Sequence, residues 1–154
     1  YIVNGDFTLK SGDVLYVSGK ATLYVTGNFT MQSGGTKSSL IQIAPNSSLK
    51  LFVGGVSTTF TTVNTAGNAA TFMYFGLPTN TSLSWNGNAT YLGTVYAPQA
   101  SFTLGGGGST PMDFQGSVVV DNVNLNGHFS VHYDENLRRI GPISGYRVVS
   151  WREL

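Results

Sequence analysis

The stretch V-N-G-D-F-T-L occupies residues 3–9, and two close copies follow it: V-S-G-K-A-T-L at residues 17–23 and V-T-G-N-F-T-M at residues 25–31. All three fit one phrase, apolar–x–Gly–polar–x–Thr–apolar. Looser forms of the phrase come later in the chain, at residues 43–49, 77–83 and 96–102. A short phrase that recurs along a whole chain is typical of a solenoid, in which each repeat is a structural unit stacked on its neighbours.

Apolar and polar residues alternate through the first copies of this phrase. The apolar side chains fall on odd positions, from Val3 to Met31, and the polar side chains fall on the even positions between them. A period of two predicts strands with one buried and one exposed face. The alternation continues unbroken through each Gly–polar pair, such as Gly5 and Asp6, which favours the corner of a coil over a tight hairpin.

The spacing of the repeats indicates coils of about twenty residues, as in a parallel β-helix. Val25, for example, follows Val3 by 22 positions. The hexapeptide spacing of a left-handed β-helix is absent, so we predict an all-β fold of the right-handed parallel β-helix type. We expect one domain over residues 1–154, with coils in residues 1–131 and a C-terminal cap in residues 132–154.

The sequence also predicts how the cap is built. Residues 133–139, Y-D-E-N-L-R-R, place acidic side chains before basic ones, which suits the dipole of a short helix. Residues 144–151 have the pattern of a final strand. A solenoid needs such a cover because an exposed apolar end promotes aggregation. Residues 52–70, where the alternation weakens, are expected to form an irregular coil.

Charged residues are scarce in this chain. They make up 10% of the 154 residues, against about 25% in an ordinary soluble domain. The net charge of +1 supplies no field for nucleic acid or for an acidic membrane, so neither is an expected partner. No apolar run reaches the ~20 residues that span a bilayer, and direct membrane insertion is not expected. Because strand-like sequence begins at Tyr1, we expect a piece of a longer, exported protein.

Acidic residues give little support for an enzyme. A polysaccharide hydrolase needs two carboxylates within about 5–9.5 Å of each other, and the candidates are Asp113, Asp121 and Asp134. A polyuronate lyase would need a basic residue on its central coils, but no Lys or Arg lies between Leu51 and Asn136. We therefore predict no catalytic residue, and polysaccharide hydrolysis is the alternative.

His128, His132 and Asp134 are the candidates for a metal site. Two histidines four residues apart could share one ion on a helix. The surrounding sequence G-H-F-S-V-H-Y is strand-like, however, and a strand would hold the two about 13 Å apart. We therefore predict no metal and no other cofactor, and we expect Asp134 to cap the short helix.

Aromatic side chains are the candidates for a ligand-binding face. Tyr16 and Tyr24 fall on the polar, outward positions, while Trp85, Tyr91 and Tyr96 lie in the middle coils. Rings along one face of a solenoid can stack on the sugars of a glycan or contact a partner protein. They can equally pack against neighbouring side chains of their own chain. The sequence leaves both interpretations open.

Three further phrases resemble a known family. They are G-T-V-Y-A-P-Q-A-S-F-T-L at residues 93–104, F-Q-G-S-V-V-V at residues 114–120 and H-Y-D-E-N-L at residues 132–137. Together they resemble a bacterial right-handed β-helix module of unknown function, found at the C-terminal end of exported, surface or pilus-assembly-associated proteins. Gln99 stands where the family's phrase has Asn. The resemblance implies an extracellular or cell-surface location and carries over no catalytic residue.

Two functions of different classes follow. In the first, the chain is a non-catalytic structural or adhesive module of a bacterial cell-surface or pilus-associated protein. Its partners would be other surface subunits, a glycan, or further copies of the chain stacked end to end in a filament. In the second, it is a carbohydrate-active β-helix that binds or hydrolyses a polysaccharide. The positions of the carboxylates and of the aromatic rings distinguish the two.

Overall fold

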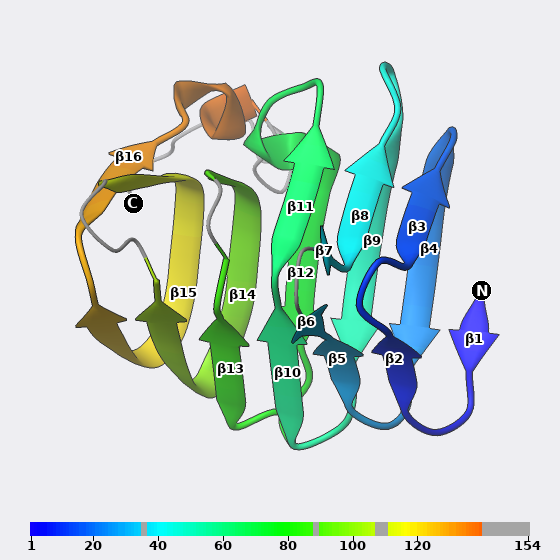
Figure 1. Ribbon diagram of the computed structural model, residues 1–154. Helices are drawn as coiled ribbons and strands as arrows, with labels where there is room; N and C mark the ends of the chain where they lie inside the picture. The colour runs from blue at the N-terminus through cyan, green and yellow to red at the C-terminus, as the bar shows by residue number, and fades with distance from the viewer. Residues whose placement is uncertain (35–36, 88–89, 107–110, 140–154) are drawn as a thin grey trace, which may run out of the picture.

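The computed structural model describes residues 1–34, 37–87, 90–106 and 111–139. Its strands wind in successive coils and pair in parallel with the strands of the next coil, so the fold is a β-solenoid. Figure 1 shows the coils arranged side by side along one axis, with the N-terminus at one end. The predicted all-β parallel β-helix is therefore confirmed.

Each coil contributes one strand to a first face. Equivalent residues lie beside one another there, as Val3 lies beside Val25 and Val25 beside Val53. In spatial order the strands of this face are β1 (Ile2–Val3), β4 (Lys20–Val25), β9 (Ser48–Val53), β12 (Phe72–Gly76), the first halves of β14 (Tyr91–Gly105) and β15 (Met112–Asn126), and β16 (Phe129–Tyr133).

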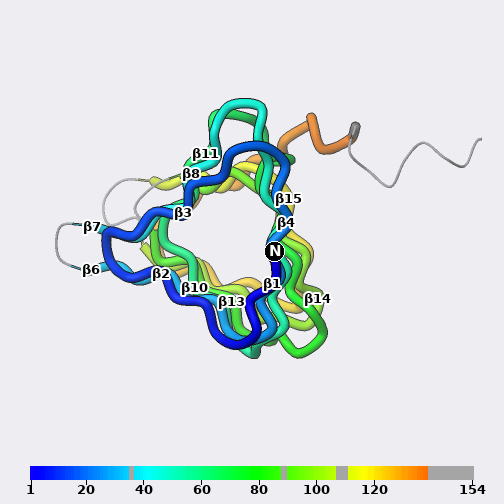
Figure 2. The backbone as a smooth tube through the Cα atoms, turned by 90° about the vertical axis from the view of Figure 1, so that its right-hand side faces the viewer, coloured from blue at the N-terminus to red at the C-terminus, as the bar shows by residue number. Residues whose placement is uncertain are grey.

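Two further faces complete the coils, and the described strands of the third face come from the first three coils only. The long strands β14 and β15 bend where their register shifts, between Ala97 and Ser101, and so belong to two faces. The second face holds their second halves with β2 (Phe7–Leu9), β5 (Phe29–Met31), β10 (Ser57–Phe60) and β13 (Ser82–Trp85). The third face holds β3 (Val14–Val17), β8 (Leu40–Ile43) and β11 (Thr62–Thr65). The antiparallel pair β6 (Ser33–Gly34) and β7 (Lys37–Ser38) projects from one corner (Figure 2).

The Gly–polar pairs lie at corners of the coils, as the unbroken alternation predicts. Gly5 and Gly19 have φ angles of +115° and +86°, which residues other than glycine rarely adopt. The amide of Gly27 donates to the carbonyl of Gly5, and the amide of Gly55 to that of Gly27, each at 2.9 Å. Seen from the N-terminal end in Figure 2, the chain turns clockwise as it recedes, which is the predicted right-handed sense.

The interior of the coils is apolar. The odd-numbered side chains of the first coils point into it, as predicted, and the rings of Tyr91 and Phe114 stack there with centroids 4.6 Å apart. The buried side chains of the first coils are Leu9, Val17, Leu23, Val25, Phe29 and Met31. Full burial of one such side chain contributes about 1.5–3 kcal/mol, so stacked apolar side chains, and not charges, hold the coils together.

A buried hydrogen-bond cluster lies at the corner between β12 and β13. The hydroxyl of Tyr74 donates to Asn80 Oδ1 at 2.8 Å and lies 2.7 Å from Thr58 Oγ1, while Asn80 Nδ2 donates to the Gly55 carbonyl at 2.8 Å. Burial raises the pKa of the Tyr74 phenol far above its usual range. The hydroxyl of Tyr91 is also buried, yet it has no hydrogen-bond partner among the described residues.

Substitution of these two tyrosines by Phe is expected to change stability in opposite directions. Tyr74→Phe leaves the buried Asn80 Oδ1 without its donor, although Thr58 Oγ1 still accepts from Asn80 Nδ2 at 3.1 Å. It is expected to lower the free energy of unfolding by about 1–3 kcal/mol. Tyr91→Phe removes an unpaired hydroxyl and is expected to leave stability unchanged or to raise it by up to about 1 kcal/mol. Urea unfolding followed by circular dichroism measures both. An equal loss in the two variants would contradict the difference in hydrogen bonding.

Two predictions about local structure can be compared with the chain. The short helix predicted in residues 133–139 is a 3-10 helix, η2 (Glu135–Arg139), which follows β16. Residues 52–70 are not irregular, because β10 and β11 lie within them and continue the second and third faces. The predicted final strand at residues 144–151 lies outside the described residues.

Candidate functional site

One outward row of the first face is aromatic in successive coils. Tyr24 lies in register with Phe52, Phe52 with Phe75, and Phe75 with Tyr96. These four side chains are named the aromatic ladder. Neighbouring strands lie about 4.8 Å apart, so the ladder crosses the strands and follows the axis of the solenoid. Ile2 and Val119 extend the same row at its two ends and are 72% and 49% exposed.

The rings of Phe52, Phe75 and Tyr96 in the aromatic ladder pack on one another. The Phe52 and Phe75 rings have centroids 4.6 Å apart and planes inclined by only 11°. The Tyr96 ring lies 6.5 Å from that of Phe75 and is tilted by 53°. Because Phe52 and Phe75 cover each other's faces, they offer ring edges to a ligand. A sugar ring stacks on an exposed face, so this geometry favours apolar contact with a protein.

The five aromatic residues predicted to form a binding face do not lie together. Tyr24 and Tyr96 belong to the aromatic ladder, but Tyr16, which is 64% exposed, lies on β3 in the third face. Trp85 and Tyr91 are each 1% exposed, and their rings meet inside the coil with centroids 5.5 Å apart. The prediction that these two rings are available to a ligand is wrong, because both side chains occupy inward positions of their strands.

Phe52 and Phe75 were missed as candidates from the sequence. Each alternates with inward side chains, Leu51 and Val53 around Phe52 and Tyr74 before Phe75, so the period of two could have placed both rings outward. Their alignment with Tyr24 and Tyr96 depends on the register between coils. The sequence alone does not give that register, because the connections between strands differ in length.

The outward side of the second face carries hydroxyl side chains in register. Neighbours are linked by hydrogen bonds, as from Ser84 Oγ to Thr59 Oγ1 at 3.1 Å and from Ser101 Oγ to Asn122 Oδ1 at 2.7 Å. The longer of two such rows contains Thr8, Thr30, Thr59, Ser84, Thr103 and Asn124. We call this longer row the hydroxyl row. It is a neutral, polar surface, and the bond between Ser84 and Thr59 joins successive coils.

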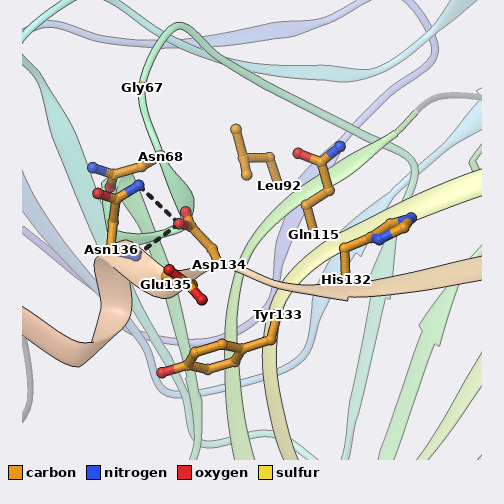
Figure 3. Close-up of a pocket in the computed structure, with 9 residues that line it drawn as sticks. All are labelled: Gly67, Asn68, Leu92, Gln115, His132, Tyr133, Asp134, Glu135 and Asn136. Carbon is orange, nitrogen blue, oxygen red and sulfur yellow. Dashed lines mark hydrogen bonds between the residues drawn. The ribbon is translucent and has the colours of Figure 1, made fainter.

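A polar pocket of about 340 Å³ lies where η2 meets η1 (Ala69–Thr71), as Figure 3 shows. Its lining includes Asn68, Gln115, His132, Asp134 and Glu135. In Figure 3 the carboxylate of Asp134 points toward η1 and η2, while the imidazole of His132 points away from it. The pocket therefore does not bring these two candidate residues into contact.

Backbone amides from two distant segments hold the Asp134 carboxylate. Oδ2 accepts a hydrogen bond from the Ala69 amide at 2.8 Å, and Oδ1 accepts from the Asn136 amide at 3.0 Å. These bonds, that of Ala69 first, hold the pKa of Asp134 below its usual value. Asp134 thus caps the η2 turn, as predicted for the expected helix, and it also ties η2 to η1.

Removing the charge of Asp134 is expected to loosen η1. Asp134→Asn weakens a charge-assisted bond to the Ala69 amide, which should exchange its hydrogen about tenfold faster or more. The folded pKa is lowered, so the ionised carboxylate stabilises the fold above the unfolded pKa, and this stabilisation is lost as pH falls through the folded pKa. Amide exchange measured by NMR tests both effects, with Glu135→Gln as the control. Unchanged Ala69 protection in Asp134→Asn would refute this role.

The other candidate carboxylates do not converge. Asp113 and Asp121 lie eight residues apart on β15, which at about 3.3 Å per residue separates them by roughly 20 Å or more. A glycosidase pair must lie within about 5–9.5 Å. Asp113 lies instead 3.6 Å from His132 Nε2, with both side chains substantially exposed. These two carboxylates cannot serve together as acid and base on one glycosidic bond.

The candidate metal ligands are dispersed as well. His128 precedes β16 and His132 lies within it, so their segment is extended, as the sequence predicts. Within the described ranges, no three His, Cys, Asp or Glu side chains are grouped so that they could hold a metal ion. Among the predicted aromatic candidates, the structure brings Tyr24 and Tyr96 into one row, the aromatic ladder.

Comparisons with known proteins place the chain in a family. Neither the curated proteins nor the solved structures contain a match to it. In the part of the chain that the structure describes, no helix has the length and apolar character to cross a membrane. The family described as Domain of unknown function (DUF7305) matches residues 1–140, almost the whole sequence. The chain is therefore a member of this family, whose domain here is a β-solenoid.

Proposed function

We propose that the chain is a non-catalytic structural and adhesive module of a bacterial cell-surface or pilus-associated protein. In this role it is a stiff rod outside the cell whose first face contacts a partner protein. The resemblance of residues 93–104, 114–120 and 132–137 to a surface-associated module supports the location. The aromatic ladder is the single observation on which the docking role rests.

The ladder suits docking for a physical reason. Parallel strands fix its side chains at regular intervals, so little conformational entropy is lost on binding. Aromatic side chains are enriched at protein interfaces. Tyr96 is half-exposed and Tyr24, Phe52 and Phe75 are partly exposed, so the ladder presents a continuous apolar row to the surface. One flanking outward row contains Thr22, Lys50, Thr94 and Ser117, with Met73 at its middle, so the ladder is an apolar strip with a mostly polar edge on that side.

Adhesion is tested with beads that carry the full chain, allowed to settle on a cell monolayer and then exposed to flow. We expect Phe75→Ser/Tyr96→Ser beads to detach at lower shear than wild-type beads. Tyr16→Ser removes an exposed ring from the third face and should leave retention unchanged. Retention of wild-type beads no better than that of albumin-coated beads would reject the adhesive role.

Self-assembly is a second form of the same function. Both ends of the described solenoid expose apolar side chains: a groove of about 310 Å³ near Phe7, Leu15 and Leu23, and a pocket of about 150 Å³ near Val123 and Leu125. The parallel strands of one copy could continue into those of the next. Light scattering over a wide concentration range tests this, since a monomer at every concentration would rule out end-to-end stacking.

Glycan binding is the alternative function, and the hydroxyl row favours it. That surface is neutral, regular and rich in hydrogen-bonding groups, which suits an uncharged polysaccharide. A glycan array probed with the full chain tests this, with Thr59→Val/Thr103→Val as the variant of the hydroxyl row. Binding that this variant loses and Tyr96→Ala retains would support the glycan role over protein docking.

A further inference from the structure

We infer that the partner segment docked on the aromatic ladder is acidic, a polypeptide that carries Asp or Glu beside apolar side chains. The inference rests on the proposed function and adds the chemistry of the partner. It is carried by the position of two lysines beside the ladder.

Lys20 and Lys50 both lie on the first face: Lys50 is in the outward row next to the ladder, and Lys20 is one outward row further from it. Lys50 precedes Phe52 by two positions on β9, and Lys20 precedes Tyr24 by four on β4, so all four side chains point outward. Both lysines are exposed. Because β4 and β9 are adjacent, the two positive charges gather at one end of the ladder.

No carboxylate lies in the row of Lys50 on the described strands, and Lys20 lies in register with Ser48. The row beside the ladder runs in register through Thr22, Lys50, Met73, Thr94 and Ser117. Asp134 and Glu135 follow β16, at the opposite end of the first face. The docking surface is therefore apolar with a positive end, and Met73 widens its apolar part. Charge complementarity favours an acidic partner and disfavours a basic one.

A second copy of the chain does not fit this surface. If two copies packed with their axes parallel, the lysines of one would lie near those of the other. If the axes ran antiparallel about the centre of the ladder, the β4 strand of one copy would face the β14 strand of the other. The outward residues there are Leu92, Thr94 and Tyr96, and none of them is acidic. The lysines thus find no opposite charge in a symmetric pair.

The test uses three matched sets of short synthetic peptides that share Leu and Phe positions and differ in having Glu, Lys or Ser between them. Fluorescence anisotropy measures their binding to the full chain. We expect Glu peptides to bind about tenfold tighter than Lys peptides at low salt, with the difference shrinking as salt screens the charges. Lys20→Glu/Lys50→Glu should reverse the preference, because it inverts the charge while the ladder stays intact.

The controls separate this inference from the docking role. The double variant Phe75→Ser/Tyr96→Ser should weaken the binding of the Glu peptides about tenfold, while Tyr16→Ser should leave their binding unchanged. The single variant Tyr96→Ser, at a half-exposed ring, serves if the double variant does not fold. Equal binding of all three sets, still lost in the ladder variants, would overturn the acidic partner and leave docking intact. Peptide binding that no ladder variant weakens would overturn both.

Discussion

Gly116→Ala is expected to cost about 3–5 kcal/mol of the free energy of unfolding, by adding backbone strain to a steric clash. Gly116 has a φ of +149° and lies in register with Gly93 of the preceding coil. A Cβ at this position would overlap the Gly93 carbonyl oxygen and lie 2.9 Å from the carbonyl carbon. Backbone atoms in the middle of a paired strand cannot move aside, so β14 and β15 must separate.

Gly19→Ala is the matched control. Gly19 also has a positive φ, +86°, but no heavy atom lies within 4 Å of a Cβ built there. It should therefore show only the conformational cost, about 1–2 kcal/mol. Urea unfolding measures the difference, and amide exchange in β14 and β15 locates it. If both glycine variants lost the same stability, contact between coils would not be the cause.

The same physics explains why the fold could be predicted from the repeated phrase. Gly5, Gly27 and Gly55 stack at one corner, where the Cβ of any other residue at Gly27 or Gly55 would meet the backbone of the previous coil. In these first coils a glycine at that corner is thus a steric requirement of stacking, whereas at the next passage Asn80 lies there and donates through Nδ2 to the Gly55 carbonyl. Together with the period of two, it identified the coil, the inward positions and the corners.

The register between coils could not be predicted, and the aromatic ladder depends on it. Val25 follows Val3 by 22 residues, but Val53 follows Val25 by 28. The longer coil includes the β6–β7 hairpin, which projects without changing the pairing of β4 with β9. Because corners absorb such insertions, residue spacing does not determine which outward side chains become neighbours. Phe52 and Phe75 lie beside Tyr24 and Tyr96 because of the register of strand pairing, which the sequence does not show.

Trp85→Ala is expected to lower the free energy of unfolding by about 3–5 kcal/mol through the cavity that it leaves. The Trp85 ring is 1% exposed and packs against Tyr91 and Phe129, at centroid distances of 5.5 and 6.1 Å. Its indole nitrogen donates to the Thr61 carbonyl at 2.6 Å, which joins β13 to the preceding coil. Loss of the ring thus removes both apolar contacts and a buried hydrogen bond. A shift in the urea midpoint measures the effect.

Tyr96→Ala is the contrasting variant, because Tyr96 is 51% exposed at the end of the aromatic ladder. It should change stability by no more than about 1 kcal/mol, as surface substitutions commonly do. If Trp85→Ala were as stable as Tyr96→Ala, the interior position of Trp85 would be wrong. Any ligand binding lost in Trp85→Ala would reflect damage to the coils, whereas binding lost in a folded Tyr96→Ala variant would locate the ligand on the ladder. The two variants together therefore separate the interior that builds the rod from the surface through which it would bind.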